Sequence, residues 1–129
     1  MRGVVVSSSE LDFRPLPGRT AANPFAGHDA GGLSMRVVHL DAGAARSPHR
    51  HPHSHEAIYV VEGRGHFWED GRARRVSEGD CVLVAPGVPH ATVPDRDSGM
   101  KLVCFWPHSD LSSNIEEIAG QIDIERSGG

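Results

Sequence analysis

Short runs of apolar residues recur along the chain, and in many of them apolar and polar positions alternate. Alternation with a period of two is typical of a β-strand with one buried face, and glycine or proline at intervals of roughly eight to twelve residues favours turns between short strands. Strands are expected at residues 33–40, 57–62, 66–68, 72–76, 81–85, 90–93 and 101–106. The pattern predicts an all-β sandwich or barrel.

The two ends of the chain depart from this pattern. The N-terminal part is rich in proline and glycine, which indicates an irregular arm with one or two edge strands. Near the C-terminus four apolar residues recur at helical spacing, namely Leu111, Ile115, Ile118 and Ile122. Ser113 followed by Glu116 has the form of a capping box, so one short helix is expected there. We therefore expect an N-terminal arm (1–32), a β-barrel (33–106) and a C-terminal tail with the helix (107–129).

Length and charge narrow the class of protein. With 129 residues the chain has room for one domain with a core of its own. Its 13 basic and 17 acidic residues give a net charge of −4, so nucleic acid is not an expected partner. No apolar stretch approaches the roughly 20 residues of a membrane span, and no signal-peptide core is present. Cys81 and Cys104 lie in apolar runs without a Cys-x-x-Cys spacing, so both are expected to be buried thiols of a cytoplasmic protein.

The most unusual feature is a cluster of histidines in the middle of the chain. There are nine histidines, and five of them fall within 17 residues, from His39 to His55. His49 and His51 are two residues apart, so in an extended segment both imidazoles point to the same side and can bind one ion. Glu56 lies an odd number of residues from His51, which would place it on the opposite face of an uninterrupted strand. A break must therefore intervene, and Pro52 is its expected position.

A second segment, residues 79–90, pairs a predicted strand with a Pro-Gly turn that leads to another histidine. One ion shared by the two segments would have three imidazole nitrogens and one carboxylate as donors, from His49, His51, Glu56 and His90. This donor set suits Fe(II), Mn(II), Ni(II), Co(II) or Zn(II), and a six-coordinate ion would keep two positions free. The spacing therefore predicts one divalent metal ion with room for a small ligand or substrate.

At these residues the sequence resembles the cupin superfamily. The first cupin motif, with the form Gly…His-x-His…Glu…Gly, is matched at every position by Gly43, His49, His51, Glu56 and Gly63. The second motif is matched by Gly79, Gly87 and His90. Ala85 and Pro94 stand where the second motif usually has a proline and an asparagine, and neither position is a metal ligand.

The resemblance implies a double-stranded β-helix, or jelly roll, with a metal ion held inside one end of the barrel by the residues at positions 49, 51, 56 and 90. It implies no single reaction, because cupins include many enzyme classes and ligand sensors. We favour an Fe(II) dioxygenase-like enzyme that acts on a small organic substrate. The alternatives are a non-redox isomerase, lyase, decarboxylase or cyclase, and a non-catalytic ligand-binding cupin. A homodimer is also expected, because cupins of this size often pair edge strands or exchange terminal arms.

Other side chains have weaker claims to the site. His53 or His55 could replace a ligand in a shifted register, and Tyr59 could donate its hydroxyl to a substrate, although a tyrosine in such a strand is more often core. His39 could line the pocket as an acid or base. An inward-pointing arginine could bind a carboxylate substrate, and the candidates are Arg36, Arg46, Arg50 and Arg64. The sequence alone leaves these alternatives open.

Overall fold

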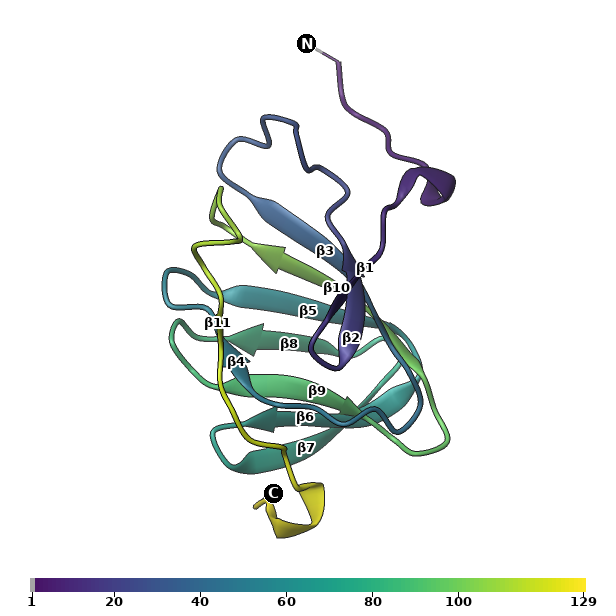
Figure 1. Ribbon diagram of the computed structural model, residues 1–129, viewed down its shortest axis with the longest axis vertical. Coiled ribbons are helices and arrows are strands. Elements are labelled where there is room, and N and C mark those ends of the chain that lie inside the picture. Colours follow the sequence, from purple (N-terminus) through teal and green to yellow (C-terminus); the bar gives the residue numbers. More distant parts are fainter. Residues whose placement is uncertain (1) are drawn as a thin grey trace.

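The computed structural model describes residues 2–129, which form two antiparallel β-sheets (Figure 1). The six-stranded sheet has the order β1-β2-β3-β10-β5-β8, and the five-stranded sheet has the order β11-β4-β9-β6-β7. The strands are β1 (Arg14–Leu16), β2 (Arg19–Ala22), β3 (Ser34–Leu40), β4 (His49–Arg50), β5 (Glu56–Glu62), β6 (Arg64–Glu69), β7 (Arg72–Ser77), β8 (Cys81–Val84), β9 (His90–Pro94), β10 (Met100–Trp106) and β11 (Glu116–Glu117). The all-β class predicted from the sequence is confirmed.

The core lies between the two sheets, because each strand buries alternate side chains. In β10 every second residue is buried, namely Met100, Leu102, Cys104 and Trp106. The five-stranded sheet contributes Phe67 from β6, and Phe67 and Trp106 are among the largest fully buried side chains. Burying one large apolar side chain contributes about 1.5–3 kcal/mol, so these positions anchor the barrel.

Strand β3 determines which of its side chains reach the interior. Val38 and Leu40 are buried, and Arg36 shares their face because side chains two residues apart point the same way. His39 lies on the opposite face, where its ring stacks on Phe13 with the ring centroids 4.3 Å apart. The strand therefore turns Arg36 toward the interior and His39 away from it.

Residues 14–22 of the N-terminal arm form an ordered hairpin. Its turn contains Gly18, whose φ of 71° is in the left-handed region that favours glycine. Strand β2 pairs with β3, so the hairpin extends the six-stranded sheet and β1 becomes its edge, as the sequence predicted for this arm. Arg19, the first residue of β2, is buried at this edge of the barrel.

The prediction of a short C-terminal helix near residues 111–122 is wrong. This C-terminal segment is extended and runs beside β4 (Figure 1). Its strand β11 pairs with β4, and the Ile118 amide donates a hydrogen bond to the Pro48 carbonyl at 2.9 Å. Leu111 is buried without a helix around it. The segment gains more from hydrogen bonds to β4 and from the burial of Leu111 than from forming an isolated helix, because the intrinsic helix propensity of a short segment is weak compared with tertiary contacts.

The predicted capping box at Ser113 does not form a helix cap. The Ser113 hydroxyl donates to the Asp110 carbonyl at 3.2 Å, and Glu116 pairs with Arg50. The helices within residues 2–129 are two three-residue 3-10 helices, Ser8–Glu10 and Ile124–Arg126. No helix in this described range is long and apolar enough to cross a membrane.

The two cysteines differ in burial, so the prediction that both are buried is wrong for one of them. Cys104 is buried, as expected, whereas Cys81 is exposed. Cys81 and Leu83 lie on the outer face of the edge strand β8, and Val84 points into the core. A continuous apolar run such as 81–84 does not reveal which alternate residues face inward.

Candidate metal centre

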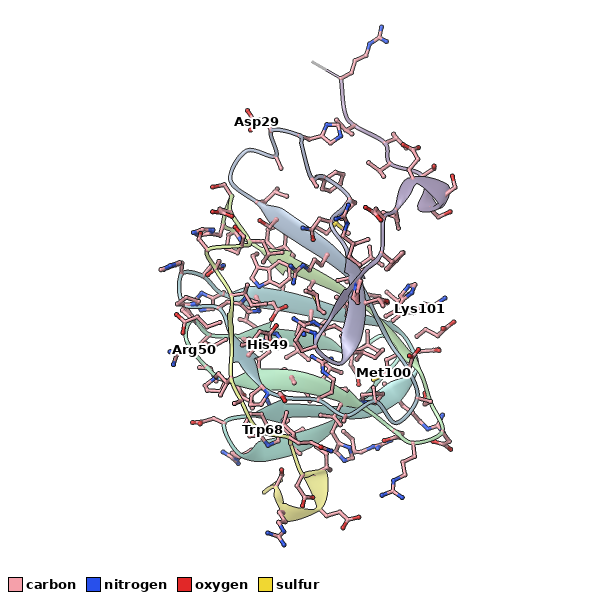
Figure 2. The ribbon with its side chains drawn as sticks, in the orientation of Figure 1. Asp29, His49, Arg50, Trp68, Met100 and Lys101 are labelled. Atoms are coloured by element: carbon pink, nitrogen blue, oxygen red, sulfur yellow. The ribbon has the colours of Figure 1, made fainter. Side chains whose placement is uncertain are left out.

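Four side chains from the two sheets meet inside the barrel. His49 and His51 come from β4 and the residue after it, Glu56 begins β5, and His90 begins β9. Each offers a donor atom, and these four atoms all lie within 4.8 Å of one another. All four residues are buried. Figure 2 shows His49 in the interior and the neighbouring Arg50 at the edge of the molecule.

The path of the chain explains how Glu56 joins the two histidines despite its odd spacing. His49 in β4 is directly paired with His90 in β9, both in the five-stranded sheet. A turn at residues 52–54 then carries the chain into the six-stranded sheet, where Glu56 begins β5. The break predicted at Pro52 is therefore confirmed, and Glu56 faces the histidines from the opposite sheet.

Hydrogen bonds orient two of the imidazole rings. The Nδ1 of His51 lies 2.7 Å from the Asn114 carbonyl oxygen, and the Nδ1 of His90 lies 2.8 Å from the Val88 carbonyl oxygen. A carbonyl oxygen only accepts, so in each ring Nδ1 carries the hydrogen. In the neutral ring the Nε2 atom then presents a lone pair, as in a metal-ligating histidine whose other nitrogen is held by a carbonyl.

The Nε2 atoms converge on one oxygen of Glu56. The Nε2 of His90 is 2.7 Å and that of His51 is 3.2 Å from Glu56 Oε1. Lone pairs at such distances repel unless a cation is shared or a proton intervenes. Two donor atoms that each lie about 2.1 Å from one ion, with a right angle between the two bonds at the ion, are about 3.0 Å apart. The separations between Glu56 Oε1 and the two Nε2 atoms are close to this value.

The charges of the cluster also fit a metal ion. Burial acts to raise the pKa of the Glu56 carboxyl, but the contacts with His51 and His90 outweigh it and lower the pKa overall. Burial and the proximity of His90 lower the pKa of His49 well below its usual value. Glu56 is therefore ionised and His49 neutral near pH 7, the states that bind metal. The His49 Nδ1 and His51 Nε2 atoms are buried without hydrogen-bond partners.

The four residues of the cluster line a small pocket with a volume of about 30 Å³. Part of the lining is apolar and comes from the barrel and the C-terminal segment, with Val38, Ile58, Leu102, Trp106 and Ile115. The polar lining outside the cluster consists of Arg19, Arg36, Arg46, Thr92 and Cys104. The lining therefore offers apolar and positively charged surface to a small molecule beside the cluster.

The arginines considered from the sequence separate into two pairs. Arg36 and Arg46 line the pocket. Arg50 and Arg64 are outside it, where each forms an ion pair on the surface. Arg19 also lines the pocket, although sequence reasoning missed it, because a single arginine after a Pro-Gly turn carries no signal of burial.

Asn114 is a second residue that sequence reasoning missed. It is fully buried, and its carbonyl oxygen accepts from His51 as described above. Its side-chain amide accepts from the His53 backbone N–H and donates to the Ser54 hydroxyl, both at 2.8 Å. Asn114 therefore connects the C-terminal segment to the turn that separates His51 from Glu56. Because a helix was expected at residues 111–122, nothing in the sequence placed Asn114 beside the metal-site residues.

The remaining candidates lie away from the pocket. His55 and Tyr59 are exposed, and Tyr59 points outward from β5 with 48% of its surface accessible. His53 stacks on His108, with the ring centroids 5.6 Å apart. Neither these residues nor His39 belongs to the cluster or lines its pocket.

Comparison with known proteins agrees with the architecture of the site. Residues 36–106 match the cupin domain. The chain belongs to the cupin family. Over 86 residues this cupin is 31% identical to an uncharacterized protein of Methanocaldococcus jannaschii, a match that covers 65% of this chain and 69% of that protein.

Solved structures of similar fold cover most of the chain. KdgF from Halomonas sp. is 25% identical, with a TM-score of 0.70 over 86% of this chain and 99% of that one. The Streptomyces nucleoside dehydratase Pac13 is 16% identical, with a TM-score of 0.77 over 98% of each chain. The DMSP lyase DddQ from Ruegeria pomeroyi is 23% identical, with a TM-score of 0.71 over 84% of this chain and 61% of that one. The likenesses under 25% identity establish the fold and not the reaction.

Proposed function

We propose that this cupin is a mononuclear metal-dependent enzyme that acts on a small organic substrate beside the metal ion. The observation that carries the proposal is the buried cluster of His49, His51, Glu56 and His90 in the wall of a pocket. A bound divalent ion would supply Lewis-acid chemistry or, for iron, redox chemistry. The protein holds the donor atoms, orients the substrate and excludes water.

An Fe(II) dioxygenase-like reaction is the first candidate. The pocket-lining residues that the structure describes include no side chain that exchanges a proton near neutral pH beyond the four proposed ligands and Cys104. Burial, with a further effect from Glu56, raises the pKa of Cys104 well above its usual value, so its thiol stays protonated. Oxygenation does not require a separate protein base, and this composition of the pocket supports it.

A non-redox reaction of the lyase, isomerase, decarboxylase or cyclase type is the second candidate. It is supported by the similarity in fold to a nucleoside dehydratase and a DMSP lyase. Because His39, His53, His55 and Tyr59 lie outside the pocket, one of the four cluster residues or the substrate itself would have to act as the base. The ion would then polarise a carbonyl or carboxylate group.

The test combines metal analysis with oxygen uptake. Untagged protein purified without added metal is analysed by ICP-MS, then assayed in an oxygen electrode with a panel of small carboxylic acids, thiols and phenols. One iron per chain and substrate-dependent oxygen uptake that His90→Ala abolishes is the expected result. One zinc, nickel or manganese per chain with conversion but no oxygen uptake would favour the second candidate. Metal and ligand binding without turnover would indicate a binding protein, and absence of metal binding would overturn the proposal.

The homodimer and the cytoplasmic location expected from the sequence remain predictions. Exposed apolar side chains on the outer face of the six-stranded sheet support the dimer, and they include Tyr59, Val61, Leu83 and Phe105. These residues lie on the neighbouring strands β10, β5 and β8, and exposed apolar surface of this kind is typical of protein interfaces. Light scattering after size exclusion should give twice the 13.9 kDa chain mass, and Leu83→Asp should halve the measured mass. A wild-type mass of 13.9 kDa would contradict the dimer.

A further inference from the structure

Two guanidinium groups face the pocket without an acidic partner. Arg46 is 3% exposed, and its Nε atom is buried with no hydrogen-bond partner. The Nε of Arg36 donates to the Asn23 side-chain oxygen at 3.1 Å, which is a neutral acceptor. Among residues 2–129 no carboxylate forms an ion pair with either side chain. Arg46 is buried and Arg36 is half-buried, and buried charges are normally paired, so the unpaired guanidinium of Arg46 above all requires an explanation.

The third arginine of the pocket differs because its charge is already balanced. Arg19 forms an ion pair with Glu117 at 3.0 Å and donates to the Pro17 carbonyl at 2.9 Å. Glu56 is the one carboxylate that lines the pocket in the described range, and it faces the histidines. A divalent ion in the cluster would make the pocket more positive still. The excess positive charge therefore lies on the side of Arg36 and Arg46.

Arg46 is held in place from two sides. A side-chain carbon added at Gly18 would lie 2.9 Å from the Arg46 Cδ, so the β1–β2 turn packs directly on the arginine stem. The backbone of Arg46 is fixed as well, because its carbonyl accepts a hydrogen bond from the Ile122 amide of the C-terminal segment at 2.9 Å. A charged group fixed in this way is preorganised for a ligand. Burial, with a further effect from Arg19, lowers the pKa of Arg46 to about 10, so it remains charged near neutral pH.

We propose that Arg36 and Arg46 form a carboxylate-binding subsite beside the metal cluster, and that the substrate is a small organic acid. The carboxylate pairs with the guanidinium groups, whose planar donor forks match its two oxygens. The rest of the molecule lies between the apolar side chains of Val38, Ile58 and Leu102 and the cluster. Phosphate oxygens also accept from guanidinium groups, so inorganic phosphate is the rival ligand in the experiment. This inference rests on the proposed function, since it names the substrate class of the same site.

The experiment compares two probes that differ mainly in charge. Propionate and propionamide are titrated calorimetrically into metal-free and zinc-loaded wild-type protein, with inorganic phosphate as a third probe. Propionate should bind to both forms, and propionamide should bind at least about tenfold more weakly because it lacks the charge. Phosphate binding tighter than propionate, or equal affinity for propionate and propionamide, would overturn the carboxylate assignment.

Variants then locate the subsite. Arg46→Met and Arg36→Met should each weaken propionate binding about tenfold to hundredfold, whereas the surface variant Arg64→Met should leave it unchanged. Arg46→Met should also raise the Tm of the ligand-free protein, because it removes an unpaired buried charge; a merely structural arginine would lower the Tm when replaced. If Arg46→Met does not fold, Arg46→Lys and Arg36→Met carry the test. Unchanged propionate affinity in the arginine variants would overturn the subsite.

Metal content measured on the same samples keeps the two proposals apart. The arginine variants should retain the zinc that the wild type binds, since neither residue belongs to the cluster. Wild-type protein that binds propionate but no metal would contradict the proposed enzyme and leave the subsite supported. Propionate binding that needs zinc and is insensitive to both arginine variants would place the carboxylate on the ion and overturn the inference.

Discussion

The polar lining of the pocket falls into two groups, the four proposed metal donors (the metal side) and Arg19, Arg36 and Arg46 (the arginine side), which depend on different parts of the chain. The metal side comes from barrel strands, in which β4 and β9 bring His49 and His90 together and β5 adds Glu56 from the facing sheet. The arginine side depends on Arg19 from the N-terminal hairpin and on Arg46, which that hairpin and the C-terminal segment hold. The hairpin and the C-terminal segment lie outside residues 36–106, which match the cupin domain. Because Arg36 and Arg46 lie within that match, the difference is that the charge offered to a substrate also depends on flanking segments that pack on Arg46 and supply Arg19 and its partner Glu117.

The largest expected effect is the loss of metal when the metal side is altered. His49→Ala or His90→Ala removes one of the four proposed donors, so each variant purified without added metal should contain little of the ion that the wild type binds. ICP-MS per chain measures this directly. His55→Ala is the matched control, since His55 is an exposed histidine near the cluster in sequence. Metal retained in both donor variants, or lost equally in His55→Ala, would contradict the four-donor site.

The sequence could predict the metal side because its residues lie in two short segments. The His-x-His spacing and the turn before His90 indicate shared ligation, and Pro52 marks the break that lets Glu56 face them. The arginine side could not be predicted in this way. Arg36 is one of four candidate arginines in the sequence, and only the alternation of inward and outward side chains in β3 shows that it faces the interior. The burial of Arg19 depends on a hairpin 30 residues before His49 in the chain. Asn114 was hidden because helical spacing near residues 111–122 mimicked a helix that hydrogen bonds to residues 46–50 prevent.

Asn114 belongs to the C-terminal segment that also holds the backbone of Arg46, and it contacts both His51 and the turn after it. Its replacement tests whether this segment supports the metal site. Asn114→Ala removes the acceptor of the partly buried His53 backbone N–H and the amide that donates to the Ser54 hydroxyl, and both bonds hold the 52–54 turn beside His51. We expect the free energy of unfolding to fall by about 1–3 kcal/mol and the metal affinity to fall about tenfold to hundredfold. Urea unfolding and a competitive zinc titration measure the two effects. The exposed neighbour Ser112→Ala is the control, and unchanged metal affinity in Asn114→Ala would show that the C-terminal segment does not support the cluster.

The stability of the metal-free protein should depend on pH through His49. Burial and His90 lower the pKa of His49 in the folded state, so below about pH 6.5 the unfolded chain takes up a proton that the folded chain does not. Stability therefore falls as the pH falls from 7 to 5, by about 2 kcal/mol at most. Urea titrations of metal-free protein at the two pH values measure the change. His49→Gln should lose less stability over this range, and an equal loss in both proteins would contradict the assignment to His49.

The smallest expected effect compares two neighbouring glutamates of β11. Glu116 pairs with Arg50 at the surface, where both side chains are more than 40% exposed, whereas Glu117 pairs with Arg19, whose side chain is 4% exposed. Glu116→Gln should change the free energy of unfolding by about 0.5 kcal/mol or less, because exposed ion pairs contribute little. Glu117→Gln should cost about 1 kcal/mol or more, because it leaves the buried Arg19 guanidinium, like that of Arg46, without a carboxylate. The same substitution should strengthen propionate binding, since it adds unbalanced positive charge to the arginine side. If the two variants change the free energy of unfolding and the propionate affinity equally, the charge of Arg19 does not influence the pocket. The positive charge offered to a substrate would then come from Arg36 and Arg46 alone.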